Sequence, residues 1–273
     1  MGLYEVGLQL KPGLVDTAHS GSHQDMNFFT SQRSAAAVSS YLTQFFAASE
    51  LTPEEPEFLL AVLRRIGIEA EAAMYEATRH VNTHKGLIFS LVLVLGAPSW
   101  VHAARFAPKG GRDFIQYVLE KVAVLGKLTL VDFELQQTED TAGMRAPRDY
   151  GLTGIRDEVA AVIPSIQEVL GELFGKPDAD LNSRALVEAL FSIMSRLDDA
   201  TLVRRGVIEA LPEVKQSAQE LLDSGALKQP SWQRAVHDLD ERFVARRLSP
   251  GGAADCLFVT LFLLWISRAH GER

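Results

Sequence analysis

Asn82, Thr83, His84 and Lys85 stand together immediately before the glycine that opens an apolar segment, residues 87–97. A polar loop that runs into a buried helix can present side chains and free backbone N–H groups to an anion. His84 adds a titratable group at this place, and Lys85 adds a fixed positive charge. The alternative is a loop in which Asn82 or Thr83 only caps the following helix.

Five further segments share this polar, turn-rich character, and long helical stretches separate them. Acidic side chains in these segments could hold Mg²⁺, and basic ones could neutralise phosphates. Ser249-Pro250-Gly251-Gly252 leads into the last predicted helix, so its backbone N–H groups form a candidate phosphate nest. A helix with Pro250 in its first turn is the alternative. The five segments are 11–16, 23–26, 150–158, 198–206 and 249–255.

Asp198 and Asp199 end a predicted helix, where two carboxylates oppose the helix dipole. We expect each to cost roughly 0.3–1 kcal/mol of stability. A bound cation would offset that cost. The alternative is a solvated acidic turn.

The composition, 47% hydrophobic and 23% charged, is that of a folded globular protein. The single cysteine, Cys256, lies in an apolar segment, and we expect it to be a buried small hydrophobe. No disulfide can form within the chain, which fits a reducing cytoplasm. The N-terminal segment lacks the pattern of a signal peptide. We therefore expect a cytoplasmic protein.

Two classes of partner are not expected. A net charge of −8 argues against general nucleic-acid binding, which normally requires a basic face. The apolar segments 87–97 and 256–266 are far shorter than the ~20 residues of a membrane-spanning helix, so we expect core helices and no membrane association.

Apolar residues recur at helical spacing, and neither a strand pattern nor an internal repeat is visible. We predict helices over 34–46, 57–77, 113–137, 156–174, 182–197, 211–224 and 231–247, and a final one after Ser249. Ser34 is the predicted cap of the first, Gly126 is predicted to interrupt the third, and Pro164 to kink or split the fourth. The prediction is an all-α fold: one domain, residues 1–273, forming a multi-helix bundle with its polar loops gathered at one end.

Together the six polar segments resemble the triphosphoribosyl-dephospho-CoA synthase family. Its members build the prosthetic-group precursor for the acyl carrier subunits of citrate lyase and malonate decarboxylase. The resemblance extends from about Lys11 to Phe262, and it is the ordered set of segments that is specific. Within 57–77 it covers Arg64, Glu69 and Glu71, which become site candidates.

The resemblance implies a reaction at an anomeric carbon. The ribose 2′-hydroxyl of 3′-dephospho-CoA attacks C1′ of ATP, adenine leaves, and the product is 2′-(5″-triphosphoribosyl)-3′-dephospho-CoA. Such a cleavage has an oxocarbenium-like transition state. A base must take the hydroxyl proton, an acid should help adenine to leave, and the triphosphate must be held in place.

The same resemblance assigns roles to residues. Glu158 or His84 is the expected base, and His84 could equally be the acid toward adenine. Asp25, Asp198 and Asp199 are expected to hold Mg²⁺ on the triphosphate. The expected nucleotide-binding residues are Lys11, Gly13, Asn82, Lys85, Arg205, Ser249, Gly251 and Gly252. The expected partners are ATP, 3′-dephospho-CoA and a downstream acyl-carrier holo-synthase or carrier subunit, and the apolar content is compatible with a homodimer.

Three segments depart from the family pattern. Arg79-His80 stands where two glycines are usual, Asp157 where a glycine is usual, and Val207 where a second glycine follows Arg205. Bulky residues at 79 and 80 would allow a different loop backbone. Two other functions therefore stay open: a degenerate homologue that binds nucleotide or carrier protein without turnover, and an ATP-dependent phosphoryl or nucleotidyl transferase. Only glycosyl transfer releases adenine.

Overall fold

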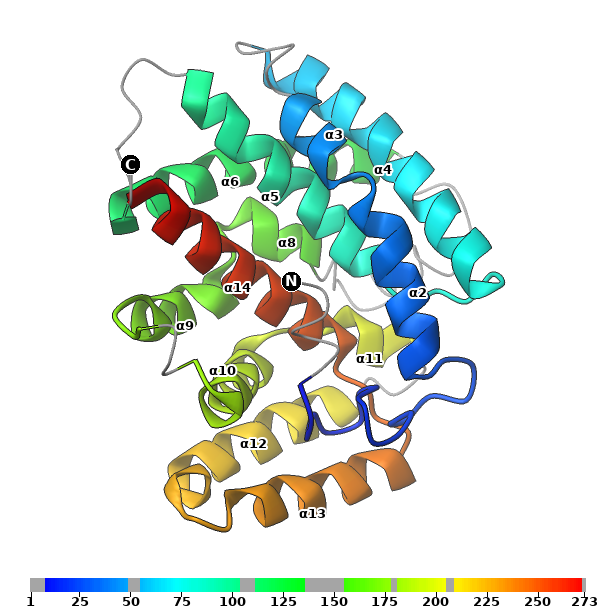
Figure 1. The fold of residues 1–273 in the computed structure, drawn as a ribbon, viewed down its shortest axis with the longest axis vertical. Helices are drawn as coiled ribbons and strands as arrows, with labels where there is room; N and C mark the ends of the chain where they lie inside the picture. The colour runs from blue at the N-terminus through cyan, green and yellow to red at the C-terminus, as the bar shows by residue number, and fades with distance from the viewer. Residues whose placement is uncertain are drawn as a thin grey trace. The chain divides into compact units, whose positions relative to one another are not determined.

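The computed structural model describes residues 8–48, 55–103, 111–135, 155–177, 181–204 and 209–271. These residues form α-helices and one short 3₁₀ helix, with no β-strand among them, which confirms the all-α prediction (Figure 1). Their contacts separate into two compact units. Unit 1 comprises Met1–Gln32, Thr141–Gly154 and Ser165–Phe258, and unit 2 comprises Arg33–Asp140, Ile155–Pro164 and Val259–Arg273. The single domain and the gathering of the loops at one end stay predictions.

Unit 2 is organised around α5 (Lys85–Ala103). The helices α3 (Leu42–Ala48), α4 (Pro56–Thr78) and α6 (Gly111–Leu135) pack against α5, and α8 (Ile155–Ala160) packs mainly on α6 (Figure 1). Residues 91–95 of α5 are all buried, as expected of a helix that is apolar on every side.

The apolar stripe predicted in 57–77 is the buried face of α4. Leu59, Leu63 and Ala70 have no exposed surface, and Leu60 and Ile66 are also buried. Pro56 occupies the first turn of this helix, where its missing N–H removes no hydrogen bond.

The helix predicted over 34–46 is two helices, α2 (Phe28–Ser39) and α3. Ser34 therefore lies inside α2, and the prediction that it caps a helix is wrong. Its hydroxyl is instead completely buried and contacts side chains near the start of α5.

Gly126 does not interrupt α6, which is continuous from Gly111 to Leu135. A Cβ at Gly126 would stand 2.8 Å from the backbone nitrogen of Ala160 and 2.9 Å from the carbonyl carbon of Val159. The glycine is thus required by the close approach of α8, a contact that the local sequence does not reveal.

Unit 1 contains α9 (Pro164–Phe174) from Ser165 onward, α10 (Ser183–Arg196), α11 (Ala200–Arg204), α12 (Ala210–Asp223), the 3₁₀ turn η2 (Ala226–Lys228), α13 (Trp232–Ala245) and the beginning of α14 (Gly251–Gly271). Pro164 splits the predicted helix, as expected. Helix α12 packs along α10, and the chain turns through η2 into α13 (Figure 1).

Among the described helices, α14 alone is long and apolar enough over Gly251–Arg268 to cross a membrane. A buried core helix has the same length and composition, and 56% of this window is buried inside the protein. The predicted apolar segment is thus part of a longer helix, and its length and composition are weak evidence for a membrane segment.

We expect Gly126→Ala to lower the free energy of unfolding by about 1–3 kcal/mol, because its methyl group would overlap the α8 backbone. Gly171→Ala, inside α9, is the matched control. A Cβ there meets nothing within 4 Å, so this variant should gain roughly 0.5–1 kcal/mol from helix propensity. Chemical denaturation measures both, and equal changes at the two positions would contradict the contact.

Candidate functional site

The beginning of α5 in unit 2 carries the polar side chains of the Asn82–Lys85 segment. The Asn82 side-chain oxygen accepts a hydrogen bond from the Lys85 N–H at 3.3 Å, which is the contact of a helix cap. The Lys85 Nζ lies 2.5 Å from the Glu71 carboxylate on α4. The Lys85 side chain is half exposed, so a ligand phosphate could replace the Glu71 carboxylate as its ion-pair partner.

His84 is nearly buried, and its surroundings hold it from two sides. Its backbone N–H donates to the Met74 Sδ at 3.3 Å. Its Nδ1 is 2.6 Å from the Ser34 Oγ, which in turn accepts a hydrogen bond from the Thr83 hydroxyl at 2.7 Å. The ring orientation is therefore fixed by a serine that lies fifty residues earlier in the chain.

Arg156 and Glu158 stand on α8, which also packs on α5. The Arg156 guanidinium lies 5.0 Å from the centroid of the Phe89 ring, one turn into α5. Burial lowers the pKa of Arg156 below its ordinary value, yet a guanidinium keeps its charge at neutral pH. This arrangement gives unit 2 a positive group stacked on an aromatic face.

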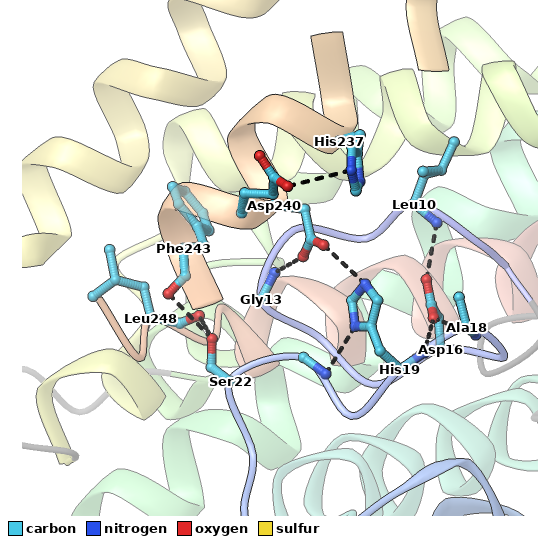
Figure 2. Close-up of polar contacts among 12 residues, drawn as sticks. Leu10, Gly13, Asp16, Ala18, His19, Ser22, His237, Asp240, Phe243 and Leu248 are labelled. Carbon is cyan, nitrogen blue, oxygen red and sulfur yellow. Dashed lines mark hydrogen bonds and ion pairs between the residues drawn. The ribbon is translucent and has the colours of Figure 1, made fainter. Parts of the chain in front are cut away.

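In unit 1 the loop of residues 10–25 is tied to α13 by Asp240 (Figure 2). One Asp240 oxygen accepts the Gly13 N–H at 2.8 Å, and the other is 2.8 Å from the His19 Nε2. The Ser22 hydroxyl donates to the Leu248 carbonyl at 2.5 Å. A Cβ on Gly13, whose φ is +71°, would stand 2.0 Å from that carbonyl oxygen, so only glycine fits there.

The predicted ligands Lys11 and Asp25 lie in this loop, and the predicted ligand Ser249 contacts it through His23. Lys11 is only 2% exposed, so its ammonium is not a surface group. The His23 Nε2 is 2.8 Å from the Oγ of Ser249, and its Nδ1 is 3.9 Å from the exposed Asp25 carboxylate. The loop thus brings His23 and Asp25 to the segment that precedes α14.

Asp199 directly precedes α11, and its side chain reaches the N-terminus of α14. Its Oδ1 accepts hydrogen bonds from the Thr201 backbone N–H at 2.8 Å and hydroxyl at 2.5 Å, and its Oδ2 accepts the Ala253 N–H at 3.2 Å. A Cβ on Gly252 would stand 2.7 Å from the carboxylate. The Thr201 hydroxyl is also 3.1 Å from the Gly251 nitrogen.

Two expectations change as a result. The Asp199 carboxylate does not oppose a helix dipole, because it faces helix N-termini, where a negative charge is favoured. The candidate phosphate nest at Ser249-Pro250-Gly251-Gly252 is not open, since the Thr201 hydroxyl accepts the N–H of Gly251 and the Asp199 carboxylate accepts the N–H of Ala253.

Burial raises the pKa of the Asp199 carboxyl, although hydrogen bonds from Thr201, Ala253 and Gly252 oppose the shift. The folded state therefore binds this proton more tightly than the unfolded state. The stability it contributes is complete below the ordinary carboxyl pKa and is lost as pH rises through the raised value.

We expect the difference in unfolding free energy between the wild type and Asp199→Asn to favour the wild type most in acid and to shrink as pH rises. Denaturation curves at a series of pH values measure this difference. A difference that grows with pH would mean that the hydrogen bonds outweigh burial.

The described residues do not form an evident binding site for Mg²⁺. These residues contain no group of three or more His, Cys, Asp or Glu side chains that could hold a metal ion. The Asp199 carboxylate accepts a hydrogen bond from the first turn of α14. Asp198 forms an ion pair with Lys215 at 2.9 Å, and Asp25 is exposed. As arranged, these carboxylates do not fit the metal, and Mg²⁺ stays a prediction.

The predicted site residues thus fall into two groups. Unit 2 holds Asn82, His84, Lys85 and Glu158, and unit 1 holds Lys11, Gly13, Asp25, Asp198, Asp199, Ser249, Gly251 and Gly252. Arg205 lies outside the described residues. Sequence reasoning missed Ser34, Thr201 and Asp240 as partners, because each contacts residues that are distant in the chain or stand outside any motif.

Comparison with known proteins identifies the family. A family model described as CitG, ATP:dephospho-CoA triphosphoribosyl transferase, matches residues 2–273. The chain belongs to this family.

Several curated proteins that share one name are similar to this member of the triphosphoribosyl transferase family. The chain is 37% identical over 271 residues to a "Probable 2-(5''-triphosphoribosyl)-3'-dephosphocoenzyme-A synthase" of Vibrio cholerae, covering 94% of this chain and 83% of the relative. It is 34% identical to the protein of the same name from Streptococcus mutans, covering 97% and 93%. A solved structure named "putative triphosphoribosyl-dephospho-coA synthase" from Archaeoglobus fulgidus has a TM-score of 0.48 at 17% identity, covering 89% of this chain and all of the other.

Arg79 and His80, which stand where the resemblance predicts two glycines, have a backbone suited to glycine. Their φ angles are +57° and +68°. The Arg79 N–H donates to the Glu76 carbonyl at 3.4 Å and the His80 N–H to the Tyr75 carbonyl at 2.7 Å, the two bonds of a Schellman helix end. The departure therefore changes the side chains and leaves a left-handed turn.

We expect Arg79→Gly to raise the free energy of unfolding by roughly 1 kcal/mol, because a left-handed backbone is unfavourable for residues with a Cβ. Arg79→Ala keeps the Cβ and is the control for loss of the side chain. Thermal or chemical unfolding of the three proteins measures the effect. If the alanine variant gained as much, the left-handed turn would not be the cause.

Proposed function

We propose that this chain is a triphosphoribosyl-dephospho-CoA synthase. It transfers the 5-triphosphoribosyl group of ATP to the 2′-hydroxyl of 3′-dephospho-CoA. The bond between C1′ and the adenine nitrogen breaks with its electron pair on adenine, a C1′–O2′ bond forms, and the hydroxyl proton ends on adenine. The family match over residues 2–273 carries this proposal.

In unit 2, the start of α5 is the part of the chain best built for the nucleotide. Lys85 is half exposed and can exchange its ion pair with Glu71 for one with a phosphate. The nearly buried His84 lies one residue away. Arg156 adds a second positive charge on α8. Together they supply positive charge beside a titratable ring, as binding and cleavage of a triphosphorylated nucleoside require.

In unit 1, we assign a mainly structural role to the loop of residues 10–25 and to the start of α14. Gly13, Asp199 and Gly252 make close internal contacts. His23 and Ser249 form a polar pair in this region that could meet a substrate hydroxyl or phosphate. The sequence predicts nucleotide binding by Gly13 and Gly252, and this proposal assigns them a structural role instead.

The metal ion, the cell compartment, the downstream partner and the oligomeric state belong to the same proposal. Mg²⁺ arrives with the ATP triphosphate, the enzyme works in the cytoplasm, and its product passes to an acyl-carrier holo-synthase or carrier subunit. A homodimer is compatible with the exposed apolar side chains Phe29, Ile68 and Trp265.

The deciding assay incubates the full chain with ATP, Mg²⁺ and 3′-dephospho-CoA. We expect free adenine, and a matching triphosphoribosyl mass gain on dephospho-CoA. Release of ADP or AMP would indicate phosphoryl or nucleotidyl transfer. ATP binding without any turnover would indicate a degenerate homologue, and either result would overturn the proposal.

Lys85→Ala should lower kcat/KM for ATP by about tenfold or more while leaving the fold intact, because a half-exposed ion pair contributes only about 0–1 kcal/mol to stability. Lys127→Ala, at an exposed position of α6, removes the same charge away from this segment and is the matched control. Equal kinetics of the two variants would remove Lys85 from the site.

A further inference from the structure

The side chains of Thr83, Ser34 and His84 form a hydrogen-bonded series that restricts where the hydroxyl and ring protons can lie. The Thr83 hydroxyl donates to the Ser34 Oγ at 2.7 Å, and the Ser34 Oγ lies 2.6 Å from the His84 Nδ1. Ser34 has no exposed surface, so water does not compete for its hydroxyl. A serine hydroxyl has one proton to donate. Its oxygen accepts from Thr83, and the described contacts of Ser34 offer its proton no acceptor other than Nδ1, so the proton is directed there.

Ser34 also differs from a serine elsewhere in α2. The Ser39 hydroxyl donates to the Ala36 carbonyl of its own helix at 2.7 Å. A serine inside a helix commonly satisfies its hydroxyl in this way. Ser34 instead contacts His84 and Thr83, two residues at the start of another helix. Its hydroxyl is thus committed to the imidazole ring.

We propose that Thr83 and Ser34 are positioning residues that fix the neutral His84 ring with its proton on Nε2. An imidazole whose Nδ1 accepts a hydrogen bond carries its proton on the other nitrogen. His84 then donates a hydrogen bond through Nε2 in the transfer and does not act as the base for the acceptor hydroxyl.

This role rests on the proposed function, and it resolves one alternative left open by the sequence. A ring nitrogen that carries a proton cannot take another from the 2′-hydroxyl. It can donate to the negative charge that develops on adenine as the bond to C1′ breaks, which lowers the barrier. The role of base then falls to another group, for which Glu158 is the remaining predicted candidate.

The tautomer is measured directly on the full chain labelled with ¹⁵N. Long-range ¹H–¹⁵N spectra distinguish a protonated from an unprotonated ring nitrogen, and loss of signals in His84→Gln assigns those of His84. We expect an unprotonated Nδ1 and a protonated Nε2 in the wild type. Ser34→Ala and Thr83→Val should shift His84 toward a mixture of tautomers, while Thr83→Ser, which keeps the hydroxyl, should resemble the wild type.

A wild-type His84 protonated on Nδ1 would reverse the chain of hydrogen bonds and overturn the inference. An unchanged tautomer in Ser34→Ala would do the same. Thr83 is only partly buried, so Thr83→Val tests the relay even if Ser34→Ala fails to fold.

Kinetics test the role of the ring. Ser34→Ala and Thr83→Val should lower kcat for adenine release roughly tenfold, with little change in KM for ATP, because they alter ring orientation and not binding. His84→Gln, whose amide can still donate near the Nε2 position, should retain more activity than His84→Ala. Equal loss in these two His84 variants would contradict the donor role. If the wild type releases no adenine, the proposed function fails, while the spectra still decide the tautomer.

Discussion

One of the buried carboxylates of unit 1, that of Asp199, must have hydrogen-bond partners. Leaving an ionised carboxylate unpaired away from water costs several kcal/mol, so the chain around Asp199 has little freedom. Thr201 and Ala253 supply the donors, and Thr201 also contacts the carbonyl of Ser249. Ser249 in turn meets His23. The position of the first turn of α14 therefore follows from the partners that this carboxylate requires, and the loop before α2 contacts that region through His23.

A buried imidazole in unit 2, that of His84, likewise requires hydrogen-bond partners. Both of the markedly apolar helices, α5 and α14, begin beside a histidine that is paired with a serine: His84 with Ser34, and His23 with Ser249. In each pair one partner comes from a distant part of the sequence. Polar groups at the start of an apolar helix need local partners, because the helix interior offers none. The same requirement that stabilises these helix ends also orients two rings capable of acid–base chemistry.

The extent to which the sequence predicted the structure follows from the range of the interactions involved. The stripe of α4, the start of α9 at Pro164 and the extent of α10 depend on neighbours along one helix, and periodicity or a single residue indicates them. Asp199 was assigned to the end of α10 because that helix precedes it, while its decisive donor at Ala253 lies 54 residues later. Ser34 and Gly126 were misinterpreted for the same reason: their partners belong to other helices.

The tight glycine contacts change how a mutational scan of this protein should be interpreted. Any side chain at Gly13 would collide with the Leu248 carbonyl, and one at Gly252 would collide with Asp199. Both glycines belong to segments that also carry candidate ligands, so nearly every substitution there will abolish activity by disturbing the fold. Intolerance at these two positions would look like evidence of phosphate binding and would measure packing instead. Half-exposed positions such as Lys85, where folding demands little, are where a loss of activity reports on chemistry.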